Sequence, residues 1–260
     1  MTPLLVAALF GLLIGLSLGV LGGGGSILTV PVLVYVIGES AHRATAASLV
    51  IVGISALTGM AVHARAGRVR LRSGALFGVI GVAGSVAGAQ LSGSVDPQLL
   101  LALFAGLMLA AAVAMLRRTR RTDPLAADRI PGATPRPSAL RIGVAATAVG
   151  LITGFFGVGG GFIVVPALVL ALGYAMPVAV GTSLLVIAIN SAAALVTRLA
   201  AGAQLDWSVI LLFSATAAIG SIAGSLVAGR VRPRRLATGF VVLLVVLAGY
   251  MLARSLPHLL

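Results

Sequence analysis

Two stretches of the sequence repeat one pattern of glycines inside apolar residues. Residues 15–31 read GLSLGVLGGGGSILTVP, and residues 150–166 read GLITGFFGVGGGFIVVP, 135 positions later. Identical residues stand at Gly15/Gly150, Leu16/Leu151, Gly19/Gly154, Gly22/Gly157, Gly24/Gly159, Gly25/Gly160, Val30/Val165 and Pro31/Pro166. Paired hydrophobic segments that glycines interrupt, one in each half of a chain, indicate the binding site of a membrane carrier.

The composition around these stretches predicts an all-α polytopic membrane protein. The chain is 60% hydrophobic and 9% charged, with a mean hydropathy of +1.17, whereas soluble domains carry about 25% charged residues. Apolar runs of this length are typical of segments that lie in a lipid bilayer. Eight such segments lie near residues 3–37, 44–63, 73–92, 98–116, 142–173, 178–198, 207–228 and 236–253.

The net charge of +13 does not indicate a nucleic-acid partner, because the basic residues, all of them arginine, lie between apolar segments. Fifteen of the 18 fall in three clusters. Basic loops that flank membrane helices mark the cytoplasmic side. The clusters are Arg65, Arg68, Arg70 and Arg72; Arg117, Arg118, Arg120, Arg121, Arg129, Arg136 and Arg141; and Arg230, Arg232, Arg234 and Arg235.

The repeat divides the chain into two membrane halves, residues 1–116 and 142–260. A second block, residues 84–88 (GSVAG), matches residues 220–224 (GSIAG) at an offset of 136, and its small residues at four-residue spacing predict close helix packing. Residues 117–141 hold four prolines and seven arginines, which predicts an irregular cytoplasmic linker.

The arginines predict that the two halves are inverted relative to each other. The loop after the second segment carries four arginines in the first half, and its counterpart, residues 198–206, carries one. After the third segment, the loop of the first half carries no arginine and its counterpart carries four. Inverted halves need an odd number of elements each. If each glycine-broken first segment forms two short helices, every half has five helical elements. Full crossing and re-entry of these pieces are both compatible with the sequence.

The glycine runs are candidate substrate-binding residues. Glycines at a break let the backbone approach a ligand and leave N–H groups unpaired, and helix N-termini attract anions. Close helix packing is the alternative interpretation. The candidates are Gly22, Gly23, Gly24, Gly25 and Ser26 in the first half, and Gly157, Gly159, Gly160 and Gly161 in the second.

Polar residues of the second long segment in each half complete the candidate site. Thr45 and Ser48 begin this segment in the first half, and Thr182 and Ser183 begin it in the second. Asn190 follows Ser183 by seven residues, two helical turns, and therefore shares its face. An unpaired amide in hydrocarbon costs roughly 2–7 kcal/mol, so Asn190 must face protein or a polar cavity. Hydrogen bonding between helices is the alternative role for these residues.

The absence of acidic residues within the apolar segments favours an anionic substrate. The five carboxylates lie in loops or at segment ends, which argues against a buried carboxylate proton relay. His42 and His63 lie at segment edges and are expected at the membrane interface; Arg198 is expected to extend to the interface. With no cysteine and no cluster of metal ligands, no catalytic, metal or cofactor site is expected, so an enzyme is excluded.

The glycine signature of each half, G-x-x-x-G-x-x-G-x-G-G followed by proline, resembles that of the sulfite exporter TauE/SafE family. The Thr/Ser-rich elements and the Gly-Ser-x-Ala-Gly blocks resemble that family too, over nearly the whole chain. Ala47 stands where the second half has Thr182, a departure between the halves. The family's glycine motif falls on Gly22, Gly24, Gly25, Gly157, Gly159 and Gly160.

The resemblance implies a multi-pass protein of the bacterial plasma membrane that transports sulfur-containing anions. We therefore expect a probable exporter of sulfite or organosulfur compounds that works by alternating access at the interface of the two repeats. An importer or facilitator of another small organic anion and an anion channel are the alternatives.

Overall fold

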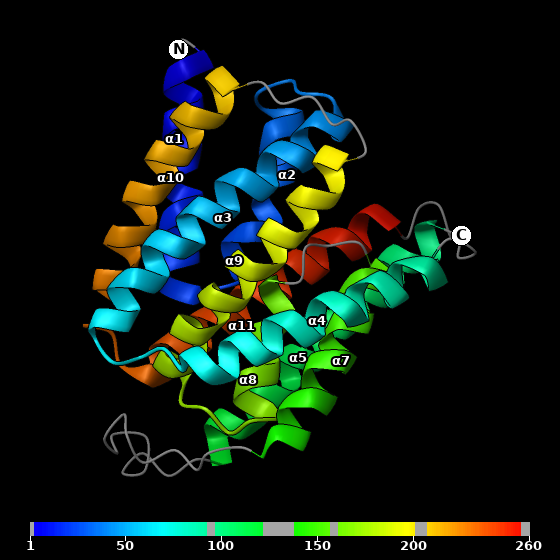
Figure 1. Cartoon of the computed structure of the whole chain (residues 1–260), viewed down its shortest axis with the longest axis vertical. Helices are drawn as coiled ribbons and strands as arrows, with labels where there is room; N and C mark the ends of the chain where they lie inside the picture. The colour runs from blue at the N-terminus through cyan, green and yellow to red at the C-terminus, as the bar shows by residue number, and fades with distance from the viewer. Residues whose placement is uncertain (1–2, 93–96, 122–137, 157–160, 201–206, 256–260) are drawn as a thin grey trace.

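The computed structural model describes residues 3–92, 97–121, 138–156, 161–200 and 207–255, and every regular element in these ranges is an α-helix (Figure 1). Six of the described helices are long and apolar enough to cross a membrane, which confirms the predicted class. The helices are α1 (Pro3–Leu21), α2 (Gly24–Tyr35), α3 (Ala41–Arg65), α4 (Leu71–Ser92), α5 (Pro97–Arg121), α7 (Ala139–Phe156), α8 (Gly161–Leu170), α9 (Met176–Ala200), α10 (Trp207–Ala228) and α11 (Pro233–Ser255).

Both of the glycine-interrupted segments form two helices. The first breaks between α1 and α2 at Gly22, whose φ of +74° is a left-handed conformation that side chains disfavour. The second forms α7 and α8, and the glycines between them, at 157–160, lie outside the described residues. At 1.5 Å per residue, α2 with 12 residues and α8 with 10 are about 18 and 15 Å long. Neither alone spans a hydrocarbon core of about 30 Å.

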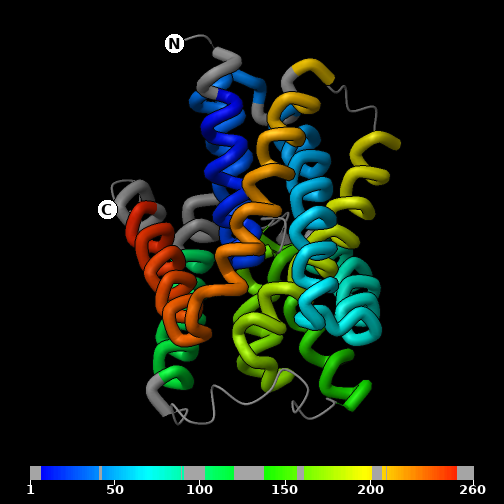
Figure 2. Tube along the Cα trace, turned by 90° about the vertical axis from the view of Figure 1, so that its left-hand side faces the viewer, coloured from blue at the N-terminus to red at the C-terminus, as the bar shows by residue number. Residues whose placement is uncertain are grey.

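The two helix pairs approach each other from opposite ends of the molecule. In Figure 2, α1 runs down from the upper end to the middle and α2 returns upward, whereas α7 rises from the lower end and α8 returns downward. Figure 1 shows the same placement, with α1 and α2 at the top and α7 and α8 below. The break between α1 and α2 and the beginning of α8 therefore lie in the middle of the molecule.

The most extensive contacts between helices join the two halves: α1 packs along α10, and α7 packs along α4. Glycines make both crossings close. A Cβ on Gly15 would overlap the carbonyl of Ala217, and a Cβ on Gly154 would overlap that of Ser85. The crossings correspond residue by residue at the sequence offsets of the repeat. The facing pairs are Gly15–Ala217 and Gly150–Gly81; Gly19–Ser221 and Gly154–Ser85; Gly220–Leu12 and Gly84–Thr147; and Gly224–Leu16 and Gly88–Leu151.

The predicted packing role of residues 84–88 and 220–224 is confirmed by these crossings. Gly88 faces the backbone of Leu151, and Gly224 faces the backbone of Leu16. Because the backbones touch where the glycines stand, each helix of these pairs presents its carbonyls and small side chains to its partner, the arrangement that favours association of helices in membranes.

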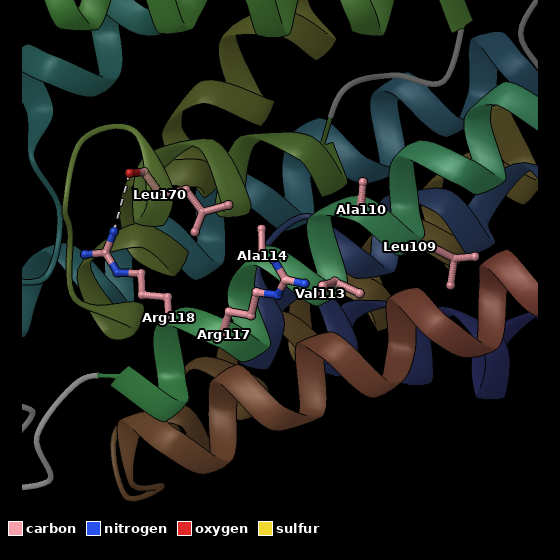
Figure 3. Close-up of a pocket in the computed structure, with 7 residues that line it drawn as sticks. All are labelled: Leu109, Ala110, Val113, Ala114, Arg117, Arg118 and Leu170. Atoms are coloured by element: carbon pink, nitrogen blue, oxygen red, sulfur yellow. Dashed lines mark hydrogen bonds between the residues drawn. The ribbon is translucent and has the colours of Figure 1, made fainter.

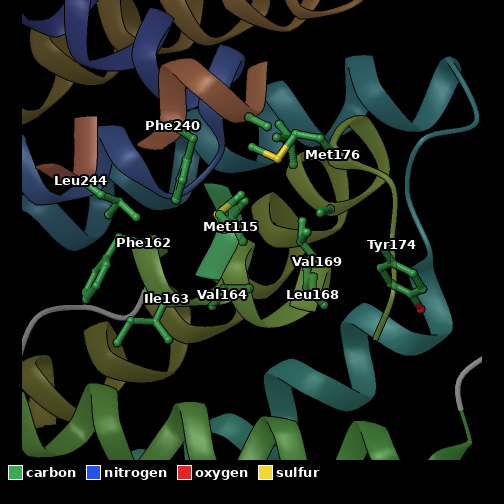
Figure 4. Close-up of a cluster of buried hydrophobic side chains, with 14 of the residues drawn as sticks. Met115, Phe162, Ile163, Val164, Leu168, Val169, Tyr174, Met176, Phe240 and Leu244 are labelled. Carbon is green, nitrogen blue, oxygen red and sulfur yellow. The ribbon is translucent and has the colours of Figure 1, made fainter. Parts of the chain in front are cut away.

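Helix α8 is enclosed by protein, although its counterpart α2 is not. Eight of its ten residues are buried, and Figure 4 shows its side chains among those of α5 and α11, including Met115 and Phe240. The ring of Phe162 meets Phe104 of α5 edge to face, with centroids 4.9 Å apart. In α2, by contrast, four residues are buried and Tyr35 is 79% exposed. The two halves thus share a plan but differ in how they enclose the returning helix.

Candidate functional site

The first helix break meets the beginning of α8 backbone to backbone. A Cβ on Gly23 would overlap the carbonyl of Gly161, the first residue of α8. From the other side, a Cβ on Gly161 would lie 3.1 Å from the Gly23 oxygen and 2.5 Å from the Ser26 hydroxyl. Gly23, Ser26 and Gly161 therefore lie together in the middle of the molecule, and Gly22 beside them lies against the Ser183 hydroxyl. We call these five residues the central cluster.

Each glycine of the first run faces a different helix. This explains why the four glycines are consecutive: a side chain at any of them would push α2 away from one of its neighbours. The close-packing interpretation of the run is therefore correct for this arrangement of the chain, in which all four glycines are buried. The facing partners are Ser183 of α9 for Gly22, Gly161 of α8 for Gly23, Leu243 of α11 for Gly24, and Ile14 and Leu18 of α1 for Gly25.

The first turn of α2 brings backbone N–H groups to the central cluster. Its N-cap, Gly23, has no side chain to cap the helix, and the first N–H groups of a helix have no acceptor within it. These groups carry the positive end of the helix dipole. Because Gly22 to Gly25 are buried in this arrangement, an anion reaches these donors only when the contacts around them open.

Two hydroxyls of the cluster donate to nearby backbone carbonyls. Ser26 Oγ donates to the Gly23 carbonyl at 2.7 Å, and Ser183 Oγ donates to the Val180 carbonyl at 2.8 Å. Their remaining lone pairs accept hydrogen bonds only. Each hydroxyl must therefore rotate away from its carbonyl before it can donate to an anion.

Thr182 lies apart from the cluster, although it precedes Ser183. Its hydroxyl accepts a hydrogen bond from the backbone N–H of Arg70 at 3.1 Å, and its methyl group lies against Gly74. Thr182 thus joins α9 to the start of α4, a role in packing between elements that the sequence offered as the alternative.

In the first half, Ser48 occupies the position in α3 that Ser183 occupies in α9. Its hydroxyl donates to the Thr45 carbonyl at 2.8 Å, and its side chain is buried. The equivalent of the Gly22–Ser183 contact would join Ser48 to Gly157. Gly157, Gly159 and Gly160 lie outside the described residues.

Asn190 has a buried side-chain oxygen without a hydrogen-bond partner among the described residues. Ser191 beside it packs against Gly53, where α9 crosses α3. The counterpart of Asn190 is Ser55, whose hydroxyl donates to Ile51 and whose carbonyl accepts from Ser221, both at 2.7 Å. The amide oxygen of Asn190 is therefore an open acceptor two helical turns from the cluster.

His63 was expected at the membrane interface but is fully buried in protein. Its Nε2 lies 3.1 Å from the carbonyl oxygen of Gly19, near the end of α1. The equivalent residue of the second half is Arg198, and the sequence carries no signal that predicts the burial of His63.

Arg118 was assigned only to a cytoplasmic cluster, yet it holds the end of α8. Its guanidinium donates to the carbonyls of Val169 and Leu170. Figure 3 shows this contact beside a hollow that five other residues of α5 line, among them Arg117. The hollow is at the C-terminal end of α5 and does not include the central cluster.

Comparison with known proteins identifies relatives over nearly the whole chain. Residues 7–251 match the family described as sulfite exporter TauE/SafE. A "probable membrane transporter protein" of Xylella fastidiosa strain 9a5c is 36% identical over 84% of this chain and 82% of its own length. One from strain Temecula1 is 35% identical over 94% of this chain and 92% of its own length. "Probable membrane transporter protein YdhB" of Bacillus subtilis is 29% identical over 67% and 70%.

Proposed function

Because the chain belongs to the sulfite exporter TauE/SafE family of membrane transporters, we propose that it exports a small sulfur oxyanion, sulfite or an organosulfonate. It is a multi-pass membrane protein and a transporter rather than an enzyme. The substrate class and the direction are our proposal. The observation that carries it is the meeting of the first helix break with the beginning of α8 at a cluster whose donors are backbone amides and hydroxyls.

The chemistry of the central cluster suits an anion better than a cation. The first turn of α2 offers N–H groups and the positive end of a helix dipole, and Ser26 and Ser183 add hydroxyls. Glu39, the one acidic residue in the described ranges, follows the opposite end of α2. A sulfonate or sulfite group has several oxygens that can accept hydrogen bonds from such a set of donors.

We propose that the two halves are inverted across the membrane and give alternating access to this cluster. In support, the two broken segments approach from opposite ends, and the two glycine crossings have equivalent partners. Two of the arginine-rich loops also adjoin, because the guanidinium of Arg68 lies against Gly229. The Gly23–Gly161 contact then separates the routes from the two sides, and a carrier opens one route at a time.

The membrane potential supports the outward direction. A potential negative inside drives each negative charge outward by about 2.3 kcal/mol per 100 mV. Export of an anion therefore needs no coupled ion for its driving force. The arrangement of the cluster also fits import or facilitated flux of another organic anion, and these outcomes are separated by the experiment below.

The test is flux in proteoliposomes of the purified full chain. We expect saturable transport of sulfite or a sulfonate that an imposed potential accelerates and that carboxylates do not inhibit. Counterflow, in which substrate on one side accelerates exchange from the other, identifies a carrier and excludes a channel. Saturable carboxylate flux without sulfur oxyanion flux would overturn the proposed substrate, and flux indifferent to potential would overturn the proposed driving force.

A further inference from the structure

His63 combines complete burial with an unused ring nitrogen. Its exposed fraction is 0%. Nε2 lies 3.1 Å from the Gly19 oxygen, and because a carbonyl only accepts, Nε2 carries the hydrogen. Nδ1 is buried without a hydrogen-bond partner. The ring is thus a neutral imidazole whose second nitrogen is free to take a proton.

The position of His63 connects a helix end to the central cluster. Gly19 is near the C-terminus of α1, where the last carbonyls of a helix have no N–H donor within it, and Gly22 is three residues further on. Helix α9 packs against α3 at His63, because a Cβ on Gly181 would be 3.0 Å from the His63 Cβ. His63, a residue of α3, therefore lies between α1 and α9, on the arginine-rich side of the break.

The charged groups around His63 are cationic. Arg65 follows it in α3, and the backbone N–H of Arg68 donates to the His63 carbonyl at 2.9 Å. The contacts described from α1, α9 and α10 to this region come from Gly19, Gly181, Ser225 and Gly229, none of which titrates. No described carboxylate faces the ring, so a second proton on the imidazole would lack both an acceptor and a counter-charge in this arrangement.

The repeat places a permanent cation where the first half has this histidine. Helices α3 and α9 each have 25 residues, and position 63 in the first corresponds to Arg198 in the second. Arg198 is half-buried near the end of α9. At this position of the repeat, one half thus carries a fixed positive charge, and the other carries an imidazole, which can take up or release a proton.

We propose that His63 is a proton-binding site that couples protonation to opening of the transporter toward its arginine-rich side. In the closed arrangement, neutral His63 fixes the end of α1 to α3 through Gly19. A proton on Nδ1 is accommodated only when water reaches the ring, which requires α1, α3 and α9 to separate there. Protonation therefore favours the open arrangement, and the movement of α1 changes the break at Gly22. The coupling to opening rests on the proposed transport function, but the first test, which measures only protonation, does not depend on it.

The first test measures the protonation of His63 without transport. Nitrogen-15 NMR of the full chain, labelled at histidine and embedded in lipid nanodiscs, reports which ring nitrogens are protonated, and His63→Gln assigns the signal. We expect the Nε2–H form at pH 8 and a one-proton titration with acid. A ring that stays neutral down to pH 5, or one that is doubly protonated at pH 8, would overturn the proposal. Absence of anion flux would leave this result intact and would overturn only the transport function.

The second test asks whether the proton affects the transport cycle. We expect the rate of sulfite flux in proteoliposomes to change at least threefold between pH 5.5 and 7.5 in the native chain and to be flat in His63→Gln, whose amide can still donate to Gly19. His63→Arg, which copies the second half, should hold the flux at its acid value. His42→Gln, at the other end of α3, is the control and should keep the native profile. Equal pH profiles in the native chain and His63→Gln would overturn the coupling.

Discussion

At the scale of the residue, the four consecutive glycines at 22–25 bring the break before α2 and its first two residues against four other helices. Each position faces another helix, so each has its own steric reason to lack a side chain. The same lack of side chains leaves this helix N-terminus without a side-chain cap. Tight packing and the anion binding that we propose would therefore have the same cause, and the two interpretations of the sequence are complementary.

Gly23→Ala should damage the meeting of the breaks. Its Cβ would overlap the Gly161 carbonyl, and overpacking of this kind costs about 1–3 kcal/mol. We expect at least a tenfold fall in anion flux and a lower melting temperature in detergent. Gly143→Ala is the matched control, because no heavy atom lies within 4 Å of its Cβ position. Native flux in Gly23→Ala would contradict a close contact at the centre of the transport route.

At the scale of the element, the α1–α10 and α4–α7 crossings are two copies of one interface. Their glycines face equivalent partners, and both are backbone contacts. In a membrane, helices gain little from burying apolar surface, so close approach and hydrogen bonding hold them together. Two hydroxyls of α10 supply such bonds to α3: Ser221 Oγ donates to the Ser55 carbonyl at 2.7 Å, and Ser225 Oγ to that of Gly59 at 3.4 Å.

Equivalent substitutions in the two crossings should have similar effects. Gly15→Leu and Gly154→Leu each place a side chain in a partner's backbone, and we expect both to lower thermal stability strongly and by similar amounts. Gly249→Leu, at a position of α11 with no atom within 4 Å, should leave stability unchanged. Thermal unfolding in detergent, followed by fluorescence-detected size exclusion, measures all three. A large difference between the first two would show that the crossings are not equivalent in energy.

Arg118 should stabilise the end of α8. A charged donor to a carbonyl contributes about 1.5–3 kcal/mol, and a cation near a helix C-terminus also favours the dipole. We expect Arg118→Leu to accelerate amide hydrogen exchange at Ala171 and Tyr174, whose N–H groups bond to α8 carbonyls. Arg117→Leu removes the neighbouring charge as a control. Equal exchange in both variants would show that charge near α5, rather than the cap, protects this end.

At the scale of the whole molecule, the two halves exchange partners, and their broken segments approach from opposite ends. Positions just before α3 and α9 allow a direct test of inversion. Ser40 and Ala175 are equivalent in the repeat and both exposed, and the chain has no native cysteine. Single Ser40→Cys and Ala175→Cys variants should react with a membrane-impermeant thiol reagent from opposite faces of the membrane. Labelling of both from one face would exclude inverted halves.

The sequence was sufficient to predict the helical class and the five elements of each half, because glycine breaks and charge patterns are local signals. It did not separate Thr182 from Ser183, since these neighbours differ by about 100° around a helix that is apolar on every side. It also placed His63 at the interface, because a residue near the end of an apolar segment gives no sign of which helices cover it. The sequence also did not predict that α8 is more buried than α2, because this difference depends on how α5 and α11 pack around α8 in the folded protein.

The exchange of partners between halves has a consequence for how the protein is made. Helix α1 is synthesised long before its principal partner, α10, because the rest of the first half, the linker and α7 to α9 lie between them in the sequence. During that time the glycine face of α1 must be covered by lipid or by an insertion factor. Neither half contains the complete set of interfaces it needs, so the two halves, produced as separate chains, should assemble when co-expressed and be degraded when each is expressed alone.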